Sequence, residues 1–113
     1  KDEKTLSKKY TQSYNNSYYA STADVIHESL KYGSWLSSWE NDGDRAEAAL
    51  LSMKNDLDVA KLITAFGKRS QQYFGFEAEK LSLFELCSKA LKESRITKIN
   101  TNWSAKGITY LIS

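Results

Sequence analysis

Residues 55–67 constrain the fold of this 113-residue chain more than any other stretch. Asn55 is a favoured N-cap, two aspartates follow it in the first turn, and Gly67 is a favoured residue at which to end a helix. Between these limits the apolar side chains recur with the helical period, at Val59, Leu62, Ile63 and Phe66. The segment therefore predicts an amphipathic helix that buries one face against its neighbours.

Four further helices follow from similar patterns. Their apolar stripes are Ala23, Ile26 and Leu30; Ala46, Ala49, Leu50 and Met53; Leu83, Leu86, Cys87, Ala90 and Leu91; and Ile96, Ile99 and Trp103. Ser82 and Glu85 form a capping box before the third stripe, and Ser94 is expected to cap the last helix, which ends at Gly107. Residues 33–44 and 70–80 lack a helical period and are expected to be connections.

The order of these elements predicts an all-α fold. The connections are mostly short and the chain has no proline, which favours a compact five-helix orthogonal bundle with residues 21–113 as a single domain. Residues 108–112 are β-branched and aromatic and are expected to form a short strand or an extended C-terminal tail pinned against the bundle. Residues 1–20 show no period but carry Tyr10, Tyr14, Tyr18 and Tyr19, so we expect a flexible, tyrosine-rich N-terminal arm.

Few residues are available for catalysis or metal binding. Cys87 is the only cysteine and His27 the only histidine, which excludes an intrachain disulfide and a Cys/His zinc site. Asp24 lies three residues before His27, which leaves a Ser-His-Asp arrangement open. No serine carries the glycine pattern of a nucleophile elbow, so an ordinary polar-face histidine is favoured. Cys87 lies on an apolar stripe and is expected in the core. We expect no enzyme activity and no cofactor.

An acidic cluster is best explained by helix capping. Its members are Glu40, Asp42, Asp44 and Glu47, and carboxylates at such a density could offer oxygens to calcium. The spacing does not fit the twelve-residue EF-hand loop, which needs ligands at alternate positions and a central glycine. No metal site is therefore expected.

Two sets of residues could bind a partner. Residues 68–113 carry eight basic and four acidic side chains, and a basic stripe crosses the last two predicted helices at Lys89, Lys92, Arg95, Lys98 and Lys106. Such a stripe could contact the phosphates of a nucleic acid without reading its sequence, or it could simply be a solvated helix face. Trp35 and Trp39 lie beside the acidic cluster and either cover the core or form a protein-binding patch.

The order of motifs resembles annexin-like repeats found in phages and mobile elements of Bacteroidota. The resemblance covers about residues 22–112, and its most specific pieces are Ala65-Phe66-Gly67-Lys68-Arg69 and Lys106-Gly107-Ile108. It implies five helices packed as in one annexin repeat, in a protein of unknown or virion-structural role. Annexins proper bind calcium through a Gly-x-Gly-Thr loop, which this chain lacks, so calcium-dependent membrane binding does not carry over.

The first functional hypothesis is therefore a non-catalytic structural or attachment module with protein partners, in a phage particle or a related assembly. The alternative is a small basic-faced helical domain that binds nucleic acid non-specifically. No apolar run is long enough to cross a membrane, no signal peptide is evident, and nothing points to a small-molecule substrate. These residues leave the location unknown, and the resemblance favours a virion or the bacterial cytoplasm.

Overall fold

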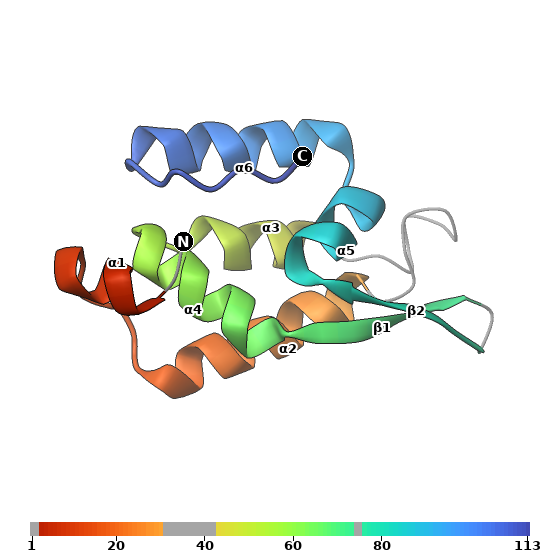
Figure 1. Cartoon of the computed structure of the whole chain (residues 1–113). Helices are drawn as coiled ribbons and strands as arrows, with labels where there is room; N and C mark the ends of the chain where they lie inside the picture. The colour runs from red at the N-terminus through yellow and green to blue at the C-terminus, as the bar shows by residue number, and fades with distance from the viewer. Residues whose placement is uncertain (1–2, 31–42, 74–75) are drawn as a thin grey trace.

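The computed structural model describes residues 3–30, 43–73 and 76–113 (Figure 1). These ranges contain six helices and one β-hairpin, so the mainly helical character expected from the sequence is confirmed. In chain order the elements are α1 (Glu3–Lys9), α2 (Asn16–Leu30), α3 (Gly43–Leu51), α4 (Asp56–Phe66), β1 (Lys68–Tyr73), β2 (Phe76–Ser82), α5 (Leu83–Ala90) and α6 (Glu93–Ala105).

Helix α4 forms as its sequence pattern predicts. The Asn55 side chain accepts a hydrogen bond from the backbone N–H of Asp58, and Gly67 ends the helix with a positive φ of 60°, which favours glycine. Val59, Leu62 and Phe66 are buried and belong to the main core. Helix α4 packs against both α1 and α2.

The main core gathers apolar side chains from α2 to α6. Trp103 of α6 is fully buried and donates its indole N–H to the Leu50 carbonyl at 2.8 Å, which satisfies the one polar atom of the ring. Cys87 is buried in the same core, as predicted. The capping box of Ser82 and Glu85 is also present at the start of α5.

The C-terminal residues form the pinned tail that the sequence predicts. Ile108 and Ile112 are buried in the main core, and the tail runs back along α6 in Figure 1. Asn100 exchanges two side-chain hydrogen bonds with the backbone of Ile112, at 2.7 and 2.9 Å. The Asp56 carboxylate accepts from both the N–H and the hydroxyl of Thr109, at 2.7 and 2.8 Å.

The β-hairpin was not expected. Residues 70–73 and 76–80, part of the predicted connection, instead belong to two antiparallel strands. The pairing extends to Lys68 opposite Ser82 and Arg69 opposite Leu81, and the register shifts between Ser70 and Gln72. Figure 1 shows the hairpin projecting from the helices. The segment Lys68–Tyr73 is almost wholly polar and lacks the apolar alternation that marks a half-buried strand, so its pattern gives no strand signal.

Residues 1–20 were expected to form a flexible arm without helices, but much of their described part is helical. Residues 3–9 form α1, and α2 begins at Asn16, seven residues before the apolar stripe that predicted this helix. Tyr19 is buried because it lies four residues before Ala23 and extends the same apolar stripe by one turn. The expected cap at Ser94 is also wrong, because α6 begins after Lys92 without a side-chain cap.

Candidate docking groove

The structure places the predicted binding residues in different settings. Trp35 and Trp39 lie outside the described residues, as do Glu40 and Asp42 of the acidic cluster. Lys89 is on α5, and Lys92 is the exposed residue that precedes α6. Arg95 and Lys98 lie on α6, and Lys106 is the residue that follows it as its C-cap.

The α6 part of the stripe faces α3 and forms ion pairs with it. Arg95 reaches the carboxylates of Asp44 and Glu47 at 2.8 and 2.9 Å, and Lys98 reaches Glu47 at 2.8 Å. Hydrogen bonding from Lys98, and then from Arg95, outweighs burial and holds the pKa of Glu47 below its ordinary value. Both described members of the acidic cluster therefore serve as partners for the basic stripe.

Lys106 has a structural contact as well. Its ammonium donates to the carbonyls of Leu51 and Met53 at 2.6 and 2.9 Å, at the carboxyl end of α3. Burial, together with repulsion from Lys54, lowers the pKa of Lys106. Arg95, Lys98 and Lys106 thus contact their own chain, and nucleic-acid binding by the stripe stays a prediction.

Asp24 and His27 join α2 to the base of the hairpin. The Asp24 carboxylate pairs with Arg69 at 2.8 Å, and His27 Nε2 lies 2.8 Å from the carbonyl oxygen of Ser70. Burial raises the pKa of the Cys87 thiol to about 12, which leaves it a poor nucleophile. Within residues 3–30, 43–73 and 76–113, no three His, Cys, Asp or Glu side chains gather in a group that could hold a metal ion.

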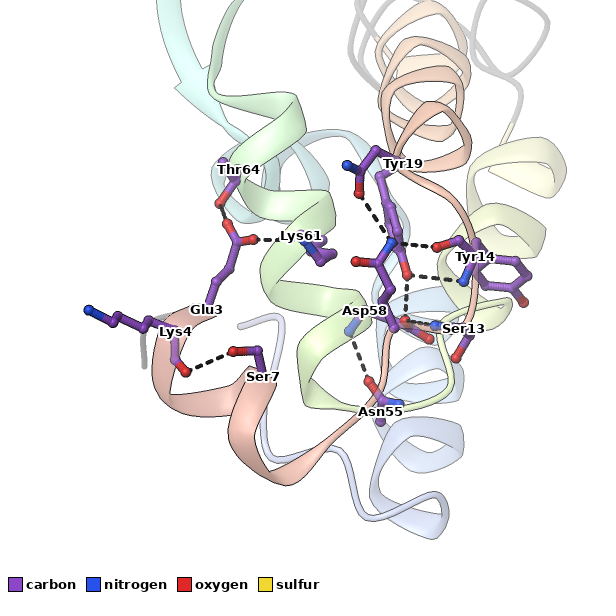
Figure 2. Close-up of polar contacts among 12 residues, drawn as sticks. Glu3, Lys4, Ser7, Ser13, Tyr14, Tyr19, Asn55, Asp58, Lys61 and Thr64 are labelled. Atoms are coloured by element: carbon purple, nitrogen blue, oxygen red, sulfur yellow. Dashed lines mark hydrogen bonds and ion pairs between the residues drawn. The ribbon is translucent and has the colours of Figure 1, made fainter.

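A buried aspartate fixes the segment before α2. The Asp58 carboxylate is fully buried on α4, and Figure 2 shows Ser13 and Tyr19 meeting it. Its Oδ1 accepts from the Tyr19 hydroxyl at 2.6 Å and from the Ser13 N–H at 2.9 Å. Its Oδ2 accepts from the N–H of Lys54 at 2.9 Å. The carboxylate is satisfied entirely by neutral donors, and these hold the chain around Ser13 against the start of α4.

Ionisation of Asp58 follows from these contacts. Burial opposes its charged form, but the hydrogen bonds from Ser13, Tyr19 and Lys54 outweigh burial and hold the pKa of Asp58 below its ordinary value. The pKa of Tyr19 is raised by burial and by donation to Asp58. The pair therefore consists of a carboxylate and a neutral phenol at neutral pH.

Two neighbouring tyrosines are held beside this network. The rings of Tyr14 and Tyr18 stack with centroids 3.9 Å apart, and each packs edge-on to Tyr19. Both hydroxyls donate to Ser52, Tyr14 to its carbonyl at 2.7 Å and Tyr18 to its side chain at 2.9 Å. Because ring faces and hydroxyls are both engaged, the pair is fixed in one arrangement. Both rings stay partly exposed.

The tyrosine pair borders an open groove between α2 and α3. The groove has a volume of about 490 Å³ and is lined by Tyr18, Ser21, Thr22 and Val25 from α2 and by Arg45, Ala48 and Ala49 from α3. A second hollow of about 480 Å³ shares Tyr18 and Ser21 and extends past Tyr14. We call the two together the tyrosine groove. Its apolar floor of small side chains and its fixed aromatic edge suit a segment of another protein.

Part of this site had a signal in the sequence. Tyr14, Tyr18 and Tyr19 stand out in the predicted N-terminal arm, and the spacing of Tyr19 from Ala23 could have placed the start of α2 one turn earlier. The role of Asp58 had no comparable signal, because its donor Ser13 lies 45 residues away.

Comparisons with known proteins give no relative for this chain. No protein-family model matches it, and neither the curated proteins nor the solved structures yielded a match. Among the described helices, none combines the length and the apolar character needed to cross a membrane.

Proposed function

We propose that the chain is a non-catalytic structural or attachment module that binds a protein partner through the tyrosine groove. The observation that carries this proposal is the fixed, partly exposed Tyr14–Tyr18 stack at the edge of the groove. Aromatic side chains at an interface bury a large area, and those already held in one rotamer lose little entropy when a partner binds.

The floor of the groove supports the same proposal. Ala48 and Ala49 of α3 and Ser21 of α2 are small, so the backbone of a docked helix or extended segment can approach closely. Arg45 adds a cationic side chain to the lining, and none of the lining residues is acidic. A partner segment with apolar side chains fits these features best.

The biological setting is proposed from the sequence resemblance. The motifs at residues 65–69 and 106–108 support an annexin-like repeat in a phage particle or a related assembly of a mobile element. In that setting, the tyrosine groove is the attachment surface for a neighbouring protein of the assembly.

Photo-crosslinking in the native host tests the proposal. A photoreactive residue at Ser21, which lines the groove, should give a discrete protein adduct, whereas the same residue at the exposed Thr101 of α6 should not. Ala48→Trp fills the groove and should remove the Ser21 adduct, while the matched control Ala48→Ser should keep it. Identical adducts from Ser21 and Thr101, or an adduct indifferent to Ala48→Trp, would show that the groove is not the attachment surface.

A further inference from the structure

Helix α1 attaches to the molecule as a unit of its own. Its buried residue, Leu6, packs with Leu57 and Ala60 of α4 in a small cluster that is separate from the main core. Tyr10 and Tyr110 pack around this cluster. The contact that holds α1 is therefore mainly with one helix, and its loss would leave the main core intact.

Polar contacts complete the same surface. The Glu3 carboxylate accepts from the ammonium of Lys61 at 3.3 Å and from the hydroxyl of Thr64 at 2.5 Å, as Figure 2 shows. Leu57, Ala60, Lys61 and Thr64 follow the helical spacing i, i+3, i+4 and i+7, so they form one stripe on α4. We call this stripe the α1 seat.

A short connection separates α1 from the rest of the chain. Helix α1 ends at Lys9, and Asp58 fixes Ser13, which leaves three residues, Tyr10–Gln12, between them. Within this hinge the Asn55 side-chain amide donates to the Thr11 carbonyl at 3.1 Å. If the hinge straightens, α1 leaves its seat while the Asp58 contacts persist.

A detached α1 is stabilised if it docks on the α1 seat of another copy. A helix of seven residues is unstable alone in water, so it depends on the contacts of Leu6 and Glu3. Every other copy of the chain carries an identical α1 seat, and short hinges favour the exchange of such elements between copies. The exchanged form keeps the seat contacts and differs from the closed form chiefly at the hinge and in the entropy of association.

We propose that α1 is an exchangeable element, which docks on the α1 seat of a second copy and links two copies reciprocally. The partner of this surface is thus another copy of the chain, whereas the tyrosine groove, which shares no residue with the seat, takes a different protein. The exchange does not require binding at the tyrosine groove, so the two proposals can be tested independently.

Mixed single-cysteine variants test the exchange. A Glu3→Cys chain and a Thr64→Cys chain are mixed at high concentration and treated with a short bismaleimide. The native Cys87 is buried, so it should not react with the bismaleimide. Exchange brings the two new cysteines together, so a crosslinked heterodimer should form and should become scarcer on dilution. A mixture of Glu3→Cys with Lys92→Cys is the control for random collision, because Lys92 is exposed and outside the seat.

Two further variants make each outcome decisive. The double variant Glu3→Cys/Thr64→Cys should crosslink within one chain at low concentration, which establishes that α1 occupies its seat. Asn55→Ser keeps an N-cap oxygen for α4 but removes the donor to Thr11, so the heterodimer yield should rise about two- to fivefold. Exchange is overturned if the double variant crosslinks but the mixture gives no heterodimer, if the Lys92→Cys control gives an equal yield, or if the double variant itself does not crosslink.

Discussion

Two buried carboxylates hold this molecule together in different ways. Asp58 is 0% exposed and accepts hydrogen bonds from neutral donors, whereas Glu47 is 8% exposed and pairs with two cations. The cations are themselves open to water, since the side chains of Arg95 and Lys98 are 30% and 66% exposed. One network is inside the protein and the other lies along a seam at its surface.

The difference determines what each network contributes. Hydrogen bonds from neutral donors in the interior are not screened by salt, and the burial of Asp58 makes each missing donor costly. The Glu47 ion pairs lie near water, where screening and side-chain entropy reduce their net value. We therefore infer that the Asp58 network determines the course of the N-terminal segment, while the Glu47 network adjusts how α6 lies on α3.

The largest expected effect is that of removing the Asp58 carboxylate. Asp58→Ala leaves the buried hydroxyl of Tyr19 and the backbone N–H groups of Ser13 and Lys54 without their acceptor, and we expect a loss of about 3 kcal/mol in the free energy of unfolding. Tyr19→Phe keeps the ring packing and removes one donor, so it should cost about 1 kcal/mol. Urea unfolding measures both. If Asp58→Ala changes the free energy of unfolding by less than about 0.5 kcal/mol, the Asp58 network does not stabilise the fold as inferred.

Low pH should destabilise the fold by protonating Asp58. The pKa of Asp58 in the folded protein lies below its ordinary value of 3.8, so its stabilising contribution is present above that pH and is lost as the pH falls through the folded pKa. The free energy of unfolding should therefore fall below about pH 4, and it should fall less steeply in Asp58→Asn. Melting curves recorded between about pH 2 and pH 6 measure how steeply the stability changes with pH. Equal slopes in the two proteins would contradict the assignment.

A smaller effect is expected at Glu47. Glu47→Gln removes the charge that pairs with Arg95 and Lys98 but keeps the size of the side chain, and it should cost about 0.5–1 kcal/mol at low salt. The loss should shrink in about 1 M salt, where charges are screened within a few ångströms. The loss caused by Asp58→Ala should be unchanged in the same salt. Equal salt responses would remove the contrast between the two networks.

The smallest expected signal is DNA binding. Arg95, Lys98 and Lys106 already contact their own chain. We therefore expect the chain not to retard DNA at about 50 mM salt, or to bind it with a Kd above about 10⁻⁴ M. Glu47→Gln loosens two of these cations and should strengthen any retardation. Micromolar binding by the native chain that declines steeply with salt would favour the nucleic-acid alternative instead.

Local patterns predicted the parts of the fold that depend on neighbours in the chain. The cap at Asn55 and the box of Ser82 and Glu85 could be recognised because donor and acceptor lie three residues apart. The stripe of α4 was equally clear. Tyr19 was missed because the polar residues around it obscure the first turn of α2, although its spacing from Ala23 is helical.

The remaining features depend on residues far apart in the sequence. The hairpin is held by pairing between β1 and β2 rather than by an apolar alternation in either strand. Periodicity placed Arg95 and Lys98 on one polar stripe of α6, but it could not show that this stripe faces Glu47 on α3. Likewise, nothing near Asp58 in the sequence identifies Ser13 as its donor. The tyrosine groove depends on such contacts, so none of its residues was among the predicted binding residues.

The two aspartates at the start of α4 also impose an order on folding during synthesis. Ser13 precedes Asp58 by 45 residues and has already been synthesised when α4 emerges, whereas Thr109 follows Asp56 by 53 residues. At typical rates of translation those residues take about 3 to 10 seconds to add. The contact between Ser13 and Asp58 can therefore form before synthesis of the chain is complete. The C-terminal tail closes last, and until it does the nascent chain exposes the apolar surface that Ile108 and Ile112 will cover.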